Sequence, residues 1–211
     1  SIQQNAAAAL GRLASHSEDL AEDVVANEIL PQLVYSLSEQ NRFYKRAAAF
    51  VLRSVAKHSP ELALAVVVRL LSYISLFSLL FLSLISLDTK ELLVFRARTP
   101  THSTKILTSQ TPQDSGALEA LVLCLEEFDP SVKEGAAWAL GYIAQHNASL
   151  AQSVVDAGAV PNLVLCIQEA EISLKRISAS ALSDICKHSP ELAQSVVDAG
   201  AVAYLAPLIQ A

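Results

Sequence analysis

The sequence repeats itself at an interval of 42 residues, and this period constrains the fold more than any other feature. The segment 193–202 (AQSVVDAGAV) is identical to the segment 151–160, and the motif KHSPELA occurs at both 57–63 and 187–193. A period of this length, with two or three helices in each unit, is typical of armadillo and HEAT solenoids. In such solenoids each repeat buries its apolar face against its neighbours.

Composition agrees with a helical solenoid. Apolar residues make up 52% of the 211 residues and aromatic residues only 6%, which favours helices packed through small side chains over a β-sandwich or barrel. The formal net charge of -6 gives no overall attraction to nucleic acid or to an anionic membrane. The three cysteines form no close pair, which indicates reduced cytoplasmic thiols without a structural zinc site.

Each unit is predicted to hold a short, a medium and a long helix. The short helix 148–157 ends at Gly158, because glycine readily adopts the left-handed conformation that stops a helix. A medium helix follows at 159–168. The long helix 131–146 begins after Asp129-Pro130, a capping residue followed by proline at the first helical position. This order predicts an all-α, right-handed armadillo superhelix of about four partial or complete repeats.

One unit is longer than the others. His58 and His146 hold the same place in their units but are 88 residues apart, which is one period plus 46 residues. Matching the flanking sequences places the extra segment at 68–113. The chain is therefore predicted to consist of armadillo repeats at 1–67, a non-repeat insert at 68–113, and armadillo repeats at 114–211.

The insert has two unlike parts. Residues 70–87 carry no charge and would by themselves fit a transmembrane helix, whereas 99–113 is polar and predicted to be disordered. A membrane span is disfavoured, because it would separate two halves that must share one core. Val68-Arg69 can be encoded by a splice-donor sequence and Gln113 by a splice-acceptor end. We therefore hypothesise that the insert is a translated retained intron or a gene-model error.

Segments 40–63 (QNRFYKRAAAFVLRSVAKHSPELA), 128–169 and 182–205 resemble the sperm-associated antigen 6 family. The resemblance includes positions outside the core, such as 40–44, which a generic repeat would not dictate. Members of that family are armadillo proteins of the central pair apparatus in motile cilia and flagella. They have more repeats than this chain, which is expected to begin inside a long helix near Ile2 and to end after a medium helix at Ile209, leaving both end faces uncapped.

The resemblance implies a non-enzymatic scaffold of the cytoskeleton in the axoneme of cilia or flagella, on the C1 central microtubule, needed for ciliary and sperm motility. Its implied partners are other central-apparatus proteins and tubulin, and it implies no cofactor and no catalytic residues. No nucleophile and base pair, phosphate-binding glycine loop or carboxylate cluster is recognisable in the sequence. The alternative is a soluble armadillo adaptor for signalling or transport cargo.

The histidines and cysteines occupy repeated positions. The four aligned histidines, one in each unit, lack a carboxylate or cysteine at ligand spacing, so we predict a structural role at the C-terminal end of the long helix rather than metal binding. Cys124 and Cys166 share one repeat position, and all three cysteines are predicted to be buried small apolar residues. The aligned histidines are His16, His58, His146 and His188, and the third cysteine is Cys186.

Two sets of positions are candidates for partner binding. Importin-type armadillo proteins hold extended peptides with a ladder of asparagines, but the equivalent positions here are other residues and only Trp138 keeps the tryptophan ladder. Importin-like cargo binding is therefore disfavoured, and these positions are predicted to be exposed in a partner groove. They are Arg12, Ser54, Tyr142 and Asp184.

The second candidate set is a basic stripe at the start of the long helices. Stacked repeats would align these cations and offer them to an acidic surface such as tubulin. The alternative is that these are ordinary helix starts paired with neighbouring glutamates. The stripe comprises Lys45, Arg46, Lys133, Lys175 and Arg176.

Overall fold

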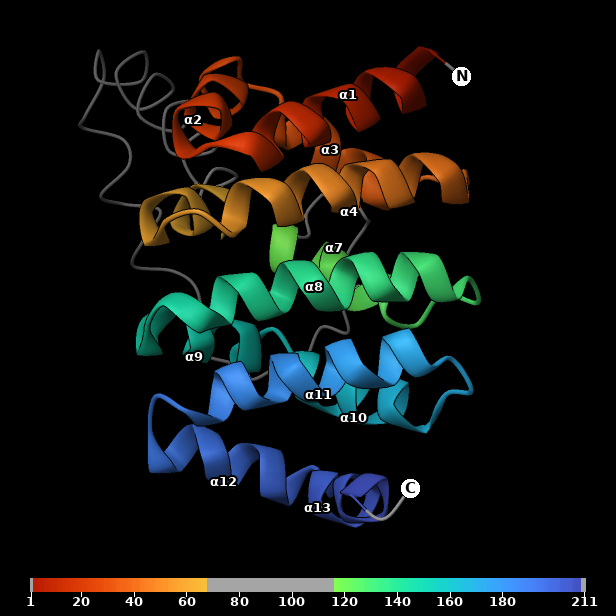
Figure 1. Cartoon of the computed structure of the whole chain (residues 1–211), viewed down its shortest axis with the longest axis vertical. Coiled ribbons are helices and arrows are strands. Elements are labelled where there is room, and N and C mark those ends of the chain that lie inside the picture. The colour runs from red at the N-terminus through yellow and green to blue at the C-terminus, as the bar shows by residue number, and fades with distance from the viewer. Residues whose placement is uncertain (1, 68–115, 210–211) are drawn as a thin grey trace, which may run out of the picture.

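Long helices stack one above another along the molecule (Figure 1). The computed structural model describes residues 2–67 and 116–209, and this part of the chain contains helices and no strand. The long helices are α1 (Ile2–His16), α4 (Arg42–Ala56), α8 (Pro130–His146) and α11 (Ile172–Cys186).

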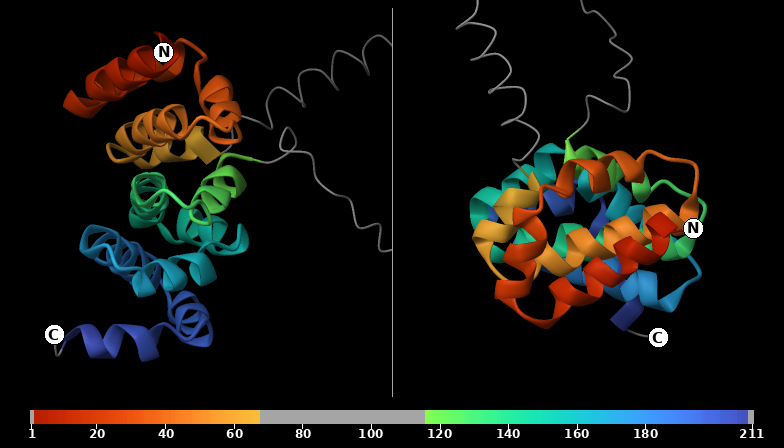
Figure 2. Two further views of the ribbon diagram at one scale, coloured as in Figure 1. Left: turned by 90° about the vertical axis from the view of Figure 1, so that its right-hand side faces the viewer. Right: turned by 90° about the horizontal axis from the view of Figure 1, so that it is seen from above.

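A second layer of shorter helices lies behind the long ones (Figure 2). Each repeat thus runs short, medium, long, as the sequence predicts. The medium helices are α3 (Leu30–Leu37), α7 (Ala117–Cys124), α10 (Ala159–Gln168) and α13 (Ala201–Leu205). The short helices are α2 (Glu18–Ala26), residues 60–67, α9 (Ala148–Asp156) and α12 (Pro190–Asp198).

Local sequence sets the helix ends. The carboxylate of Asp129 accepts a hydrogen bond from the Ser131 backbone N–H at 2.9 Å, which caps α8 as predicted. Between short and medium helices, Gly158 and Gly200 adopt φ of 82° and 80°. Glu28 occupies the same place in its own repeat with φ of 56°, a left-handed conformation that costs a residue with a side chain more than it costs glycine.

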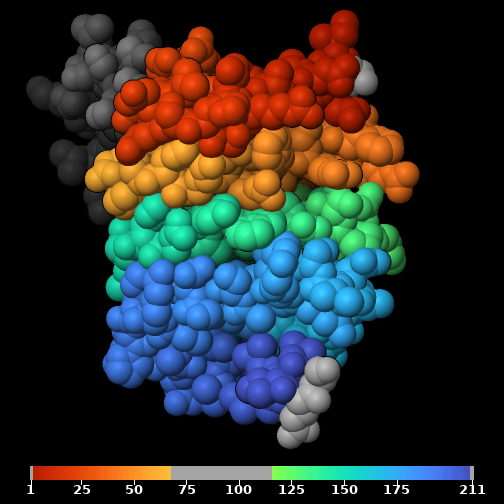
Figure 3. Space-filling model, viewed as in Figure 1, coloured from red at the N-terminus to blue at the C-terminus, as the bar shows by residue number. Residues whose placement is uncertain are grey.

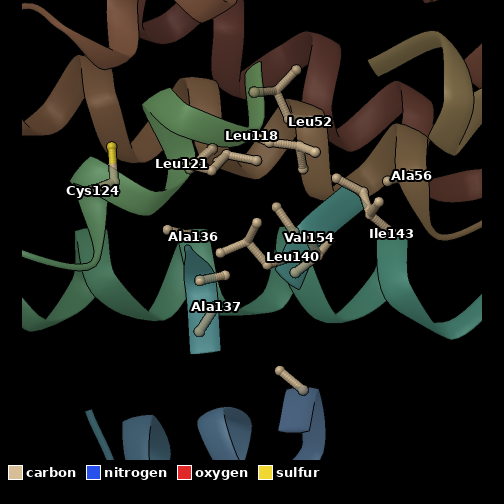
Figure 4. Close-up of a cluster of buried hydrophobic side chains, with 14 of the residues drawn as sticks. Leu52, Ala56, Leu118, Leu121, Cys124, Ala136, Ala137, Leu140, Ile143 and Val154 are labelled. Carbon is tan, nitrogen blue, oxygen red and sulfur yellow. The ribbon is translucent and has the colours of Figure 1, made fainter. Parts of the chain in front are cut away.

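The core is one cluster of buried side chains, mostly alanine, leucine, isoleucine and valine, and Figure 4 shows part of it. Leu52, Leu121, Leu140 and Ile143 are fully buried, and they come from three helices of two neighbouring repeats, α4, α7 and α8. Because these side chains interlock across repeat boundaries, each repeat is stable only beside its neighbours.

The two sides of the predicted insert keep the repeat geometry. Val66 at the end of the helix 60–67 is 3% exposed, as its counterparts Val154 and Val196 are 0% and 4% exposed. On the other side, α7 begins at Ala117 with Gly116 as its N-cap. The insert 68–113, including the uncharged segment 70–87, lies outside the described residues, and the proposed domain boundaries stay a prediction.

The last described repeat departs from expectation. The prediction of a medium helix that continues to Ile209 is wrong, because α13 ends at Leu205 and a 3-10 turn, η1 (Ala206–Ile209), follows. Pro207 has no N–H to continue the α-helical hydrogen bonds, which accounts for the early end.

No single helix in residues 2–67 and 116–209 has the length and apolar character needed to cross a membrane. Two bent helix pairs, α9 with α10 and α12 with α13–η1, meet the length and composition criteria together.

Candidate protein-binding groove

A histidine from each repeat fixes the position of the preceding long helix. His58 Nε2 lies 2.7 Å from the Ala14 carbonyl oxygen, His146 Nε2 lies 2.7 Å from that of Ala56, and His188 Nε2 lies 2.7 Å from that of Ala144.

These bonds satisfy carbonyl groups in the last turn of a long helix, which have no partner within the helix itself. The predicted structural role is therefore observed at three of the four positions, with the bond made to the preceding repeat. His16 is exposed and has no partner in the described part of the chain.

A groove of about 540 Å³ lies among α1, α4 and α8. These helices belong to the long-helix layer, on the side of the molecule that Figure 3 shows. Its lining is unusually basic for a chain with net charge -6. Three guanidinium groups, from Arg12, Arg46 and Arg53, stand against one carboxylate, Glu134, giving a formal charge of +2. Two aromatic rings, those of Phe43 and Phe50, also line the groove.

The groove arginines are available for a ligand. Arg12 and Arg46 are exposed, and within residues 2–67 and 116–209 no carboxylate pairs with them or with Arg53. Three unpaired cations that share a hollow repel one another, and an anionic ligand would relieve that repulsion. The groove is therefore suited to carboxylate groups.

Stacked aromatic rings hold Arg53 in place. Its guanidinium carbon lies 5.1 Å from the centre of the Phe50 ring and 5.6 Å from that of Trp138, in cation–π geometry. Trp138 in turn stacks on Tyr142 at 5.2 Å between ring centres. Because the rings come from α4 and α8, the packing of two repeats orients this cation before any ligand arrives.

Space for Phe50 comes from a glycine in the neighbouring helix. A Cβ atom on Gly11 would lie 2.4 Å from Cδ1 of Phe50, much closer than van der Waals contact. Only glycine at this position lets the ring lie against α1 in its present position. The shape of the groove wall therefore depends on a contact between repeats.

The predicted exposed row is incomplete. Arg12 lines the groove and Tyr142 is half-buried in the aromatic stack, but Ser54 is only 2% exposed and its hydroxyl donates to the Phe50 carbonyl at 2.8 Å. The prediction that Ser54 is exposed is wrong, because α4 packs against long helices on both sides, α1 and α8, and this small side chain is buried in that packing. Asp184 pairs with Lys187 of its own helix end at 2.9 Å. A partner-binding role for the row stays a prediction.

Ion pairs with glutamates remove two lysines from the predicted basic stripe. Lys45 binds Glu127 and Lys133 binds Glu169, and both lysine side chains are largely buried, at 11% and 14% exposed. Each glutamate belongs to the following repeat, so these lysines join repeats and leave little charge for a partner.

Arg46, Lys175 and Arg176 have no ion pair among the described residues, and of these Arg46 faces the groove. The partner-binding role of the stripe remains a prediction.

The cysteines are protected rather than reactive. Burial raises the pKa of the Cys124 thiol to about 12, and burial also raises the pKa values of Cys166 and Cys186. Cys124 and Cys166 are each 1% exposed, as predicted, whereas Cys186 is only half-buried. Among the described residues, no group of three or more histidine, cysteine, aspartate or glutamate side chains could hold a metal ion.

Sequence reasoning missed Arg53 and Phe50. A signal was present, because Arg46 and Arg53 are seven residues apart and so lie on one face of a helix. What the sequence alone did not reveal is that Arg12, from the preceding repeat, meets them in the same hollow.

The fold and the groove define a protein-binding scaffold of the armadillo type. The family described as Armadillo/beta-catenin-like repeat matches residues 113–145. An engineered protein of known structure is similar over 99% of this chain and 67% of its own, with a TM-score of 0.74 and 26% identity. A designed armadillo repeat protein in complex with the peptide (KR)4 aligns over 99% of this chain and 68% of its own, with a TM-score of 0.72 and 20% identity. The predicted armadillo solenoid is confirmed.

A more particular similarity covers a smaller part of the chain. Over 47 residues the sequence is 74% identical to sperm-associated antigen 6 of Mus musculus and to that of Homo sapiens. The matched region is 22% of this chain and 9% of either relative.

Proposed function

We propose that this chain is a non-enzymatic protein-binding scaffold of the ciliary or flagellar central apparatus. The observation that carries the proposal is the 74% identity to sperm-associated antigen 6 over 47 residues. Its cellular place would be the axoneme, its partners other central-apparatus proteins and tubulin, and its contribution the structural integrity that motility requires.

The groove supports a partner with acidic groups. Arg12, Arg46 and Arg53 offer charge-assisted, bidentate hydrogen bonds to carboxylates, and Arg53 is already oriented by its two rings. The designed protein that binds (KR)4 holds a basic peptide. The three arginines here would repel such a peptide, so an acidic segment of an axonemal protein is the better match.

Co-sedimentation of the full chain with stabilised microtubules tests the proposal. The variant R12Q/R46Q/R53Q should weaken binding at least tenfold and reduce its salt dependence, since three cations are removed from one site. The matched control is R42Q/K57Q/K187Q, which removes the same number of cations from positions outside both the groove and the basic stripe. Equal loss in both variants would show that the attraction is general and would overturn the role of the groove.

Localisation tests the cellular part. A fluorescent fusion expressed in ciliated cells should lie along the central axis of the axoneme. Exclusion of the fusion from cilia, together with no binding to isolated axonemes, would contradict the proposal and favour the soluble adaptor.

A further inference from the structure

Two similar hollows lie near the C-terminal ends of the medium helices and share no residue with the groove; the surface that carries them is called here the outer face. The first outer pocket, of about 390 Å³, lies between α3 and α7 and is walled by Leu37, Leu123 and Glu126. The second outer pocket, of about 440 Å³, lies between α7 and α10 and is walled by Leu125, Leu165 and again Glu126. Medium helices, whose layer Figure 2 shows, contribute to both pockets, and Lys45 and Lys133 of the long helices line them as well.

The two pockets are copies made by the repeat. Leu37 and Leu125 hold the same repeat position and are 2% and 3% exposed, so each forms a buried floor. Leu123 and Leu165 also hold one position and are 52% and 59% exposed, so each forms a protruding apolar wall. The pairs Lys45–Glu127 and Lys133–Glu169 border the pockets in the same way.

The same repeat position carries a large, exposed apolar side chain in successive repeats. These side chains form a row on the surface. Tyr35 in α3 continues this row, since it holds the repeat position of Leu123 and is 50% exposed. Single exposed leucines are ordinary on a protein surface, but periodic ones beside hollows are typical of an interaction site.

Charge distinguishes this surface from the groove. The two lysines at the pockets are already neutralised by their glutamates, whereas Glu126 is exposed and lines both pockets. Its Oε1 accepts a hydrogen bond from the Asn162 side-chain amide at 2.9 Å, and no lysine or arginine of the described chain pairs with it. A negative charge therefore lies midway between two apolar hollows.

We propose that this outer face binds an amphipathic α-helix of a partner protein, through two large apolar side chains seven residues apart and a lysine or arginine between them. Packed helices are about 8–10 Å apart, so the pockets, one repeat apart, have a comparable spacing. Seven residues of α-helix rise about 10.5 Å and bring two side chains to one face. An extended strand covers a similar distance in three residues, but its residues i and i+3 point to opposite sides, so it cannot fill both pockets.

The basic residue of the partner would contact Glu126. In a helix it stands three or four residues from each apolar anchor, on the same face, and so falls between the two pockets. This site is separate from the arginine groove and does not depend on the axonemal proposal. A chain with both sites could join an acidic segment on one face to a basic amphipathic helix on the other.

Binding of synthetic helical peptides to the full chain, followed by fluorescence anisotropy, tests the proposal. The probe is an alanine-based peptide with two leucines seven residues apart and a lysine between them. Companion peptides place the leucines four residues apart, or replace the lysine by glutamate. We expect the probe to bind at least tenfold more tightly than either companion.

Variants of the chain locate the binding. L123S/L165S should abolish the preference, and E126K should reverse it in favour of the glutamate peptide. L13S is the control, because Leu13 is 48% exposed on α1 and lines neither outer pocket, and it should leave binding unchanged. Unchanged circular dichroism melting of each variant excludes loss of folding as the cause.

Three results would overturn the proposal. They are no binding of any peptide at millimolar concentration, binding that L123S/L165S leaves intact, and a preference for the four-residue spacing. Sedimentation equilibrium gives a further outcome. If the chain associates with itself and L123S/L165S abolishes that association, the outer face binds a second copy of this chain instead of a partner helix.

Discussion

The groove and the outer face are built by the same repeats, but they differ in how they use the repeat. Along the long-helix face, one repeat position reads Arg12, Ser54, Tyr142 and Asp184 in turn, so every repeat offers different chemistry. Along the outer face the leucine walls, leucine floors and lysine–glutamate pairs recur from one repeat to the next. A surface that changes at each step can select one partner in one register, whereas a periodic surface fits a partner that is itself periodic.

Buried residues between the repeats hold the stack together, whereas the residues that wall the outer pockets face solvent. The largest effect is expected at Leu140, which is fully buried in α8. L140A should reduce the free energy of unfolding by about 2–5 kcal/mol, measured by urea denaturation, because it leaves a cavity between repeats. L165A, at an exposed wall of the second outer pocket, should change it by no more than about 0.5 kcal/mol. Equal losses would show that the outer wall is part of the core.

Removal of 68–113 tests whether the repeats on either side form one continuous stack. Joining Val67 to Asp114 restores the 42-residue spacing and replaces a long connection by a short one. The shorter connection should raise stability by about 3 kcal/mol through a lower loop-closure cost. Circular dichroism melting beside the intact chain measures this gain. No gain, or failure to fold, would mean that the segment is an integrated element.

The histidine contacts should have a smaller effect. H146A removes the hydrogen bond to the Ala56 carbonyl and should cost about 1–2 kcal/mol in thermal or urea unfolding. H16A is the control, since the exposed His16 lacks this contact within the described residues. A cost for H16A equal to that of H146A would show that the effect comes from the side chain itself and not from the bond between repeats.

Glu28 offers a test in the stabilising direction. Its φ of 56° matches the left-handed conformation that Gly158 and Gly200 adopt in other repeats. E28G should therefore stabilise the chain by about 1 kcal/mol, whereas E22G inside α2 should destabilise it by about the same amount. The two melting temperatures, measured side by side, should move in opposite directions. A lower melting temperature for E28G would show that the glutamate side chain contributes more than the backbone costs.

The smallest effect at neutral pH is expected for Cys124. Its pKa in the folded chain is about 12, against an ordinary value of 9.0. Because the folded state favours the protonated thiol, the stability that this group contributes is complete below pH 9 and is lost as the pH rises from about 9 toward 12. C124A should lessen that alkaline loss in urea unfolding while leaving the pH dependence below 9 unchanged. An identical alkaline slope in both proteins would contradict the assigned cause.

Local signals in the sequence were enough to place most helices. The capping Asp129-Pro130 and the turn at Gly158 depend only on neighbouring residues, and the 42-residue period is visible as repeated sequence; all three are found in the structure. Cys124 was placed in the core correctly because the same repeat position holds a second cysteine, Cys166, and a free cysteine packs as a small apolar residue. The helix expected to reach Ile209 shows the limit of this reasoning, since the pattern was followed across Pro207.

The sequence by itself determined that this chain is an α-solenoid, because hydrophobic period and capping chemistry act over a few residues. Only the tertiary structure decided which polar side chains are available. Ser54 is covered, Lys45 is paired with Glu127, and Arg12 comes together with Arg46 and Arg53, each because of contacts made with an adjacent repeat. Such contacts depend on how one helix lies against the next, a geometry that no single 42-residue unit specifies.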